Sequence, residues 1–152
     1  MIDYAVDATW RPARLRIQTQ EHRLVLVADA GRLVGERDGE PLEIPYREDL
    51  GYRSPVFNAV TANRLGRSGD VEALSLETET LRDRPERQRY ELQGPERVAT
   101  PVGAFEATVW RYTALETGWT ARLCVAGDVV VAFEGAYELI SYEPGPRGPF
   151  PS

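Results

Sequence analysis

The two side chains most often used for metal binding and nucleophilic chemistry are rare in this sequence of 152 residues, which has one histidine, His22, and one cysteine, Cys124. A zinc site needs three or four cysteine, histidine or carboxylate ligands, and neither residue has a clustered partner. Cys124 follows Leu123 in an apolar stretch, where a cysteine behaves as a small buried hydrophobe. No glycine-rich phosphate loop follows a strand. The sequence therefore predicts no metal and no cofactor, and leaves a Cys124–His22 pair as the remaining nucleophilic arrangement.

Glu134 has the most informative position among the carboxylates, because it interrupts the apolar run from Val129 to Phe133. A carboxylate in such surroundings must be paired, be solvated at a strand end, or have a shifted pKa. The simplest interpretation is a cross-strand ion pair with Arg122. The alternative is that Glu134 anchors the polar head of a ligand.

The turn before this run decides which side chains share a face of the sheet. A three-residue turn, Ala126 to Asp128, pairs Val125 with Val129, gives one wholly apolar face and puts Arg122 near Glu134. A two-residue turn is a strong hairpin type, but it places the two charged residues on different faces. We therefore predict the three-residue turn. The opposite face still carries apolar residues, so we expect this strand pair to be covered on both sides or to line a cavity.

Four of the seven aromatic residues in the stretch from Gly103 to Tyr142 are candidate site residues, and the stretch alternates as four short strands. Trp110 and Tyr112 fall on one face of a strand whose opposite face is also apolar. Such a strand is expected to face the core on one side and a cavity on the other. Trp119 and Phe133 extend the set on the following strands. Aromatic residues at strand spacing are usually core residues, and the alternative is that these four line a pocket.

Alternation of apolar and polar residues predicts strands through most of the chain, so the fold class is mainly β. The predicted strands are residues 2–8, 13–20, 22–29, 32–37, 40–46, 71–80, 88–93, a short piece near 98, and the four strands within 103–142. Asp38-Gly39 is the strongest hairpin signal in the chain. The charged run from Arg82 to Arg89 is expected to be a solvated turn.

One segment lacks alternation, and the helical spacing of its apolar residues predicts a short helix over residues 55–65. Ser54 is expected to cap the helix, with Pro55 in its first turn. Gly66 is expected to end it. An ordered loop is the alternative for this segment.

Length and composition suit one domain with a hydrophobic core, since 42% of the residues are hydrophobic. The rhythm of strands predicts a single-domain antiparallel β-roll or half-barrel over residues 1–143. The tail at residues 144–152 is rich in proline and glycine and is expected to be disordered.

The net charge of −6 argues against nucleic-acid binding and against attraction to anionic membranes, both of which need a basic surface. All 18 basic residues are arginines. One cysteine fits a reducing compartment. No signal peptide is visible, and no apolar run approaches about 20 residues. We therefore expect a cytoplasmic protein with no membrane insertion.

The segment EDLGYRSPVFNAVTANRL, residues 48–65, resembles the signature of a family of glycolipid-binding proteins. The matching positions are Asp49, Leu50, Gly51, Tyr52, Pro55, Asn58 or Asn63, Arg64 and Leu65. The stretch DYAVDATWRPARLRI is similar to the family's tryptophan-containing corner, and LCVAGDVVVAFEGAYELI is similar to its closing pair of strands.

This chain departs from the family in two places. The family run usually reads Asn-Thr-Leu-Pro-Ile-Arg-Arg, where residues 58–64 here read Asn-Ala-Val-Thr-Ala-Asn-Arg. The chain also begins almost at the tryptophan corner, so N-terminal strands of the family are expected to be missing. The resemblance implies a spiral β-roll, similar to the half-barrels of lipoprotein carriers, and a lipid or glycolipid as ligand.

We therefore expect a protein that binds an apolar or amphipathic small molecule, of the lipid or glycolipid class, in the concave face of a β-roll. The expected ligand-binding residues are Tyr52, Asn58, Asn63, Arg64, Trp110, Tyr112, Trp119, Arg122, Phe133 and Glu134. One alternative is a small cofactor-free enzyme, of isomerase or cyclase type, that uses Glu134 or His22 in the same cavity. Another is an interaction module that forms a homodimer through a sheet edge or an apolar face.

Overall fold

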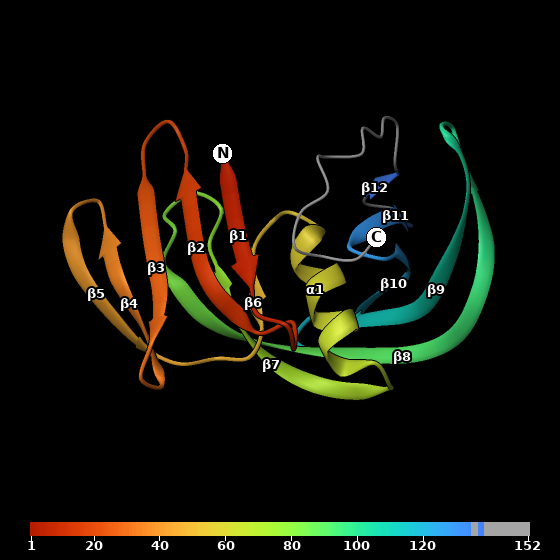
Figure 1. The fold of residues 1–152 in the computed structure, drawn as a ribbon, viewed down its shortest axis with the longest axis horizontal. Coiled ribbons are helices and arrows are strands. Elements are labelled where there is room, and N and C mark those ends of the chain that lie inside the picture. The colour runs from red at the N-terminus through yellow and green to blue at the C-terminus, as the bar shows by residue number, and fades with distance from the viewer. Residues whose placement is uncertain (135–136, 139–152) are drawn as a thin grey trace.

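The computed structural model of the chain describes residues 1–134 and 137–138, which form two β-sheets and one helix (Figure 1). In the first sheet each strand pairs antiparallel with the next along the chain. Its strands are β1 (Ile2–Val6), β2 (Pro12–Gln18), β3 (Arg23–Asp29), β4 (Arg32–Arg37) and β5 (Glu40–Pro45). The mainly β prediction is confirmed. The predicted tail at residues 144–152 lies outside the described residues.

The second sheet has seven strands and curls into a half-barrel (Figure 1). Its strands are β6 (Leu50–Gly51), β7 (Gly69–Leu76), β8 (Asp83–Thr100), β9 (Gly103–Ala114), β10 (Trp119–Ala126), β11 (Val129–Phe133) and β12 (Tyr137–Glu138). The strands β7 to β12 pair antiparallel in chain order. At the edge of the sheet β6 pairs parallel with β7, because helix α1 (Val56–Leu65) crosses over between them.

The hairpin between β4 and β5 has the predicted turn at Asp38-Gly39. Both residues have positive φ, 52° and 82°, as a two-residue turn of this hand requires. The Asp38 carboxylate holds the turn, since it accepts a hydrogen bond of 2.8 Å from the Arg23 N–H and lies 2.8 Å from Nδ1 of His22. The single histidine of the chain therefore fixes a turn of the first sheet.

Helix α1 matches the predicted range, and its two ends differ in how they are held. Gly66 ends the helix in a left-handed conformation and donates its N–H to the carbonyl of Ala62, as expected. The predicted cap at Ser54 is wrong, because Pro55 occupies the N-cap position and no side chain caps the helix. Instead the backbone carbonyl of Ser54 accepts the N–H of Phe57 at 3.4 Å.

The predicted turn at Arg82–Arg89 is also wrong, since nearly all of this charged run belongs to the 18-residue strand β8. The run forms a strand because its charged side chains lie in water and pair across the sheet. Arg89, for example, makes a two-pronged pair with Asp70 on β7, at 2.8 and 3.1 Å. The turn itself precedes the strand, where Leu81 adopts a φ of 56° and is fully buried.

The connection between β10 and β11 is a two-residue turn, so the predicted three-residue turn is wrong. Val125 pairs with Val130 instead of Val129. Gly127 takes a φ of 61° in this turn, which a glycine adopts without steric cost. As a result Val130, instead of Val129, packs with Val125 in one core. At the start of β11 the side chains therefore point to the faces opposite to those predicted.

Because of a β-bulge next to the turn, Arg122 and Glu134 nevertheless lie opposite each other across the two strands. The register shifts at Val131, so the extra residue reverses the parity of β11 beyond it. The Glu134 N–H donates to the carbonyl of Arg122 at 3.0 Å, and their side chains lie 3.5 Å apart. The predicted Arg122–Glu134 pair is confirmed, although the turn from which it was predicted is not.

Within the described residues, the interior contains three apolar clusters. One joins the two sheets through Leu15, Ile17, Leu24, Leu26, Leu33, Ile44, Leu50, Phe57, Leu74, Leu76 and Leu81. A second joins α1 to the concave face of the curled sheet through Ala59, Ala62, Val71, Tyr90, Trp110, Tyr112, Leu123, Val125, Val130 and Phe133. The third lies on the other face and contains Val98, Ala107, Val109, Cys124 and Val131. The β10–β11 pair is therefore covered on both sides, as expected.

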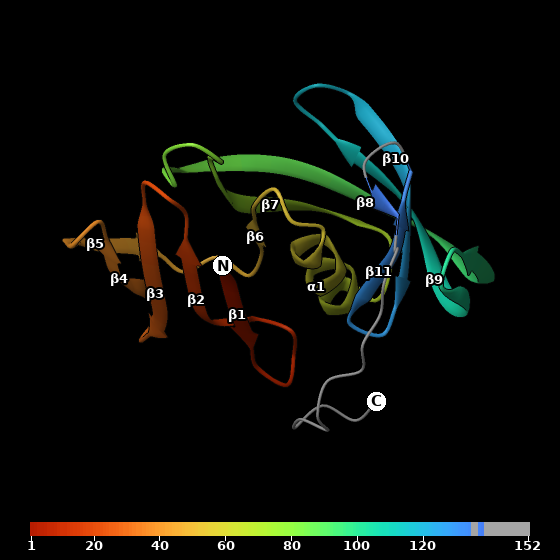
Figure 2. The same ribbon diagram turned by 90° about the horizontal axis from the view of Figure 1, so that it is seen from above.

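Figures 1 and 2 both show α1 lying within the curve of the seven-stranded sheet. The helix reaches this position because small residues, Ala59 and Ala62, face the sheet and allow close approach. Tyr90 and Trp110 fill the space between helix and sheet and are almost completely buried. The middle of the concave face is thus occupied by the protein's own side chains.

Gly35 on β4 gives a direct test of the first sheet. A Cβ atom at this position would lie 1.8 Å from the carbonyl oxygen of Val25, a distance that no side chain tolerates. We expect Gly35→Ala to lower the free energy of unfolding by at least about 2 kcal/mol, measured by urea denaturation. Gly51→Ala is the control, because its Cβ would make an ordinary contact of 3.5 Å with Ser75. Equal losses in the two variants would contradict this packing.

Candidate functional site

A pocket of about 450 Å³ lies where the start of α1 meets the inner face of strands β8 to β11. We call it the aromatic pocket, and its lining residues are Arg53, Pro55, Asn58, Glu86, Tyr112, Ala114, Thr117, Trp119 and Phe133. Its volume is within the range of small-molecule sites, and its lining is mostly apolar with a few polar groups. These are the general features of a binding site for an organic molecule.

Three aromatic rings form one wall of this pocket. The ring centroids of Tyr112 and Phe133 are 5.4 Å apart, those of Trp119 and Phe133 are 5.5 Å apart, and those of Tyr112 and Trp119 are 6.0 Å apart. Tyr112 and Phe133 are buried, whereas Trp119 is 44% exposed. An exposed tryptophan supported by two buried rings offers a large apolar surface at little cost in side-chain entropy.

A chain of hydrogen bonds runs behind the aromatic wall. The Asn58 amide donates to the hydroxyl of Tyr90 at 3.1 Å, and that hydroxyl donates to Oε1 of Gln88 at 2.9 Å. The Gln88 amide in turn donates to Oε1 of Glu86 at 3.3 Å, and the Tyr112 hydroxyl donates to the same atom at 3.4 Å. Buried polar groups are thereby satisfied, and both Asn58 and Glu86 are held at the pocket.

The electrostatics of this chain keep its tyrosines neutral. Complete burial raises the pKa of Tyr90 well above its usual value. Burial also raises the pKa of Tyr112, and the neighbouring Glu86 carboxylate adds to the effect. Both hydroxyls therefore remain hydrogen-bond donors at physiological pH.

The structure brings four of the ten predicted site residues together in the aromatic pocket: Asn58, Tyr112, Trp119 and Phe133. Trp110 is buried against α1 in the core. It also touches a second hollow, of about 410 Å³, which Arg122 and Glu134 line as well. Arg122 lies between two carboxylates there, 2.5 Å from Glu96 and 3.5 Å from Glu134, so its charge is already balanced.

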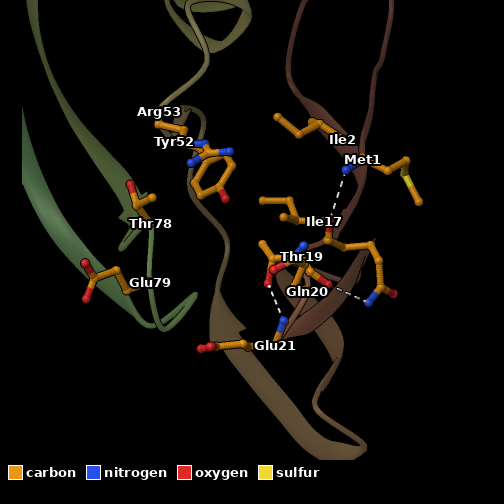
Figure 3. Close-up of a pocket in the computed structure, with 11 residues that line it drawn as sticks. Met1, Ile2, Ile17, Thr19, Gln20, Glu21, Tyr52, Arg53, Thr78 and Glu79 are labelled. Carbon is orange, nitrogen blue, oxygen red and sulfur yellow. Dashed lines mark hydrogen bonds between the residues drawn. The ribbon is translucent and has the colours of Figure 1, made fainter.

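Tyr52 lies in a third place, an open groove of about 860 Å³ at the junction of the two sheets (Figure 3). The groove is lined by the ends of β1 and β2, by the segment before α1, and by the turn at Thr78 and Glu79. Arg53 lines both this groove and the aromatic pocket, so the two are neighbours. The Arg53 guanidinium lies 5.9 Å from the centre of the Tyr52 ring.

Asn63 and Arg64 bind other parts of the protein. The Asn63 amide donates to the carbonyls of Ala59 and Gly127, at 3.0 and 2.8 Å, and so ties α1 to the β10–β11 turn. Arg64 makes a two-pronged pair with the buried Asp49, at 2.8 and 2.6 Å. This hydrogen bonding raises the pKa of Arg64.

Sequence reasoning missed Glu86, because the charged run around it was interpreted as a turn. The available signal was an alternation in which Glu86, Gln88 and Tyr90 share one parity while the arginines between them take the other. The structure follows this pattern, with Gln88 and Tyr90 buried and Arg87 exposed.

The rarer chemical groups lie away from the aromatic pocket. Cys124 is buried in the cluster on the opposite face, and burial raises the pKa of its thiol. No group of three or more histidine, cysteine or acidic side chains that could hold a metal ion occurs in residues 1–134 and 137–138. In the same residues, no helix has the length and apolar character needed to cross a membrane.

Comparison with known proteins gives one structural likeness. No family model matches the sequence, and no curated protein matches it. A crystal structure of a DUF1089 family protein from Pseudomonas aeruginosa is similar, with a TM-score of 0.65 and 24% identity, over 90% of this chain and 74% of that protein. The likeness shows the fold alone. It agrees with the predicted half-barrel and carries no information on a ligand.

The buried tyrosines are expected to make the folded protein less stable at alkaline pH. Tyr4, Tyr90 and Tyr112 have raised pKa values in the folded protein, so folding favours their neutral forms. This contribution is fully present below the ordinary tyrosine pKa of about 10, and it is lost as the pH rises above that value. We expect the free energy of unfolding, from urea titrations at stepped pH, to fall above about pH 10, and to fall less steeply in Tyr90→Phe. Stability that stays constant to pH 12 would contradict this.

We expect the protein to lose much of its stability when the arginine of the buried Asp49–Arg64 pair is removed. Arg64→Leu leaves the Asp49 carboxylate, which is 3% exposed, without its cation, so we expect unfolding to become easier by about 3–5 kcal/mol in urea. The matched control is Arg89→Leu, which breaks an equally two-pronged but exposed pair with Asp70. The control should cost far less, because water screens an exposed ion pair. Similar losses in both variants would show that burial of the pair is unimportant.

Proposed function

We propose that this protein binds an apolar or amphipathic small molecule, of the lipid or glycolipid class, in the aromatic pocket. The observation that carries the proposal is the half-exposed ring of Trp119, supported by Tyr112 and Phe133 on the wall of a pocket of about 450 Å³. Aromatic rings of this kind are common on the walls of small-molecule pockets, where they offer a large apolar contact surface.

The polar groups of the pocket favour an amphipathic ligand. Asn58 and Glu86 are held at the pocket by the hydrogen-bond chain, and Glu86 lies next to the aromatic wall, where it accepts from the Tyr112 hydroxyl. A molecule with an apolar part and a polar part would satisfy both surfaces at once. A purely apolar molecule would cover the Glu86 carboxylate without offering it a donor, which is costly.

The two residues expected to act in the enzymatic alternative, His22 and Glu134, both lie outside the aromatic pocket. His22 is bonded to Asp38 at a turn of the first sheet, and Glu134 pairs with Arg122 at the second hollow. Binding therefore accounts for more of the geometry than catalysis does.

Native mass spectrometry of protein purified without detergent tests the proposal. We expect an adduct of lipid mass on the folded protein and its loss in Trp119→Ala. In solution, the same variant should bind dodecanol or octyl glucoside, whose hydroxyls can donate to Glu86, about tenfold more weakly, a change of about 1.4 kcal/mol. Leu92→Ala is the control, because Leu92 is similarly exposed on β8 outside the pocket. Absence of any adduct, together with no binding of either probe, would refute the proposal.

A further inference from the structure

The three rings of the aromatic pocket face different directions. The planes of Tyr112 and Phe133 meet at 85°, those of Tyr112 and Trp119 at 64°, and those of Trp119 and Phe133 at 45°. Each aromatic face carries partial negative charge and attracts a cation within about 6 Å of the ring centre. Proteins hold quaternary ammonium groups among several aromatic rings, and all three of these rings line the same pocket.

The charge at this pocket also favours a cation. Many carboxylates in the described residues pair with an arginine, as Glu134 and Asp49 do. Glu86 is different, because within the described part of the chain it has no arginine partner and receives hydrogen bonds only from Gln88 and Tyr112. Its negative charge therefore remains available to a ligand.

Arg53 is the lining residue whose charge opposes a bound cation. Its side chain is exposed to water and lies 5.9 Å from the centre of the Tyr52 ring, on the side of the neighbouring groove. Charges in water are strongly screened, whereas Glu86 is partly buried beside the rings. The balance at the aromatic wall is therefore negative.

We propose that the aromatic pocket binds a quaternary ammonium group, with Trp119, Tyr112 and Phe133 around its methyl groups and Glu86 balancing its charge. This inference rests on the proposed function, since it names the polar part of the amphipathic ligand. The methylated cation fits better than a primary ammonium, because its methyl groups match the apolar rings and it needs no hydrogen-bond acceptors. It fits better than a neutral group, because it compensates Glu86.

Isothermal titration calorimetry with choline and with 3,3-dimethyl-1-butanol separates charge from shape, because the alcohol has the same form without the positive charge. We expect choline to bind about tenfold more tightly than the alcohol. Glu86→Gln should remove most of this preference while the affinity for the alcohol stays within twofold. Glu106→Gln, which removes an exposed carboxylate on β9, is the control and should leave both affinities unchanged.

A second variant keeps the test valid if Glu86→Gln fails to fold. Trp119→Leu retains an apolar side chain but removes an aromatic face, so it should weaken choline binding and spare the alcohol. Equal affinities of the two compounds for the unmodified protein would overturn the inference, and so would no binding of choline. If dodecanol or octyl glucoside still bound, the proposed function would stand. If no probe bound at all, both would fall.

Discussion

The buried ion pair between Asp49 and Arg64 fixes the helix inside the curled sheet. Asp49 precedes the short edge strand β6, and Arg64 lies in the last turn of α1. The carbonyl of Asp49 also accepts the N–H of Leu74 on β7 at 3.0 Å. One residue thus connects the edge strand, the helix and the sheet. Burying two charges is costly, and here two short hydrogen bonds and a second carboxylate, Glu48 at 2.9 Å from Arg64, offset that cost.

The position of the helix determines where a ligand has room. Half-barrels can hold a molecule in the middle of their concave face, but α1 and the rings of Tyr90 and Trp110 fill that region here. Space remains where α1 begins and the sheet extends past it, and there the chain places Trp119 and Glu86. A pocket at such an edge is shallow and accessible, so it suits recognition of one end of a molecule better than enclosure of a whole one.

Local signals in the sequence predicted the parts of the fold that depend on local geometry. The Asp38-Gly39 hairpin and the end of α1 at Gly66 were correct, because a positive φ at those positions suits few residue types. The bulge at Val131 and the length of β8 were missed, because both are decided by pairing with neighbouring strands. For the same reason the aromatic half of the site was anticipated from its alternation, whereas Glu86 was assigned to a turn.

A second bulge, in β8 between Leu92 and Gly94, limits how the chain can change in evolution. Tyr90 and Val98 have the same parity along the strand, yet they lie in clusters on opposite faces, because the register shifts between Leu92 and Gly94. Gain or loss of a single residue on either side of this shift would exchange core and solvent faces for that half of the strand. Insertions and deletions should therefore collect in the loops of related chains, and the spacing from Glu86 to Val98 should remain constant.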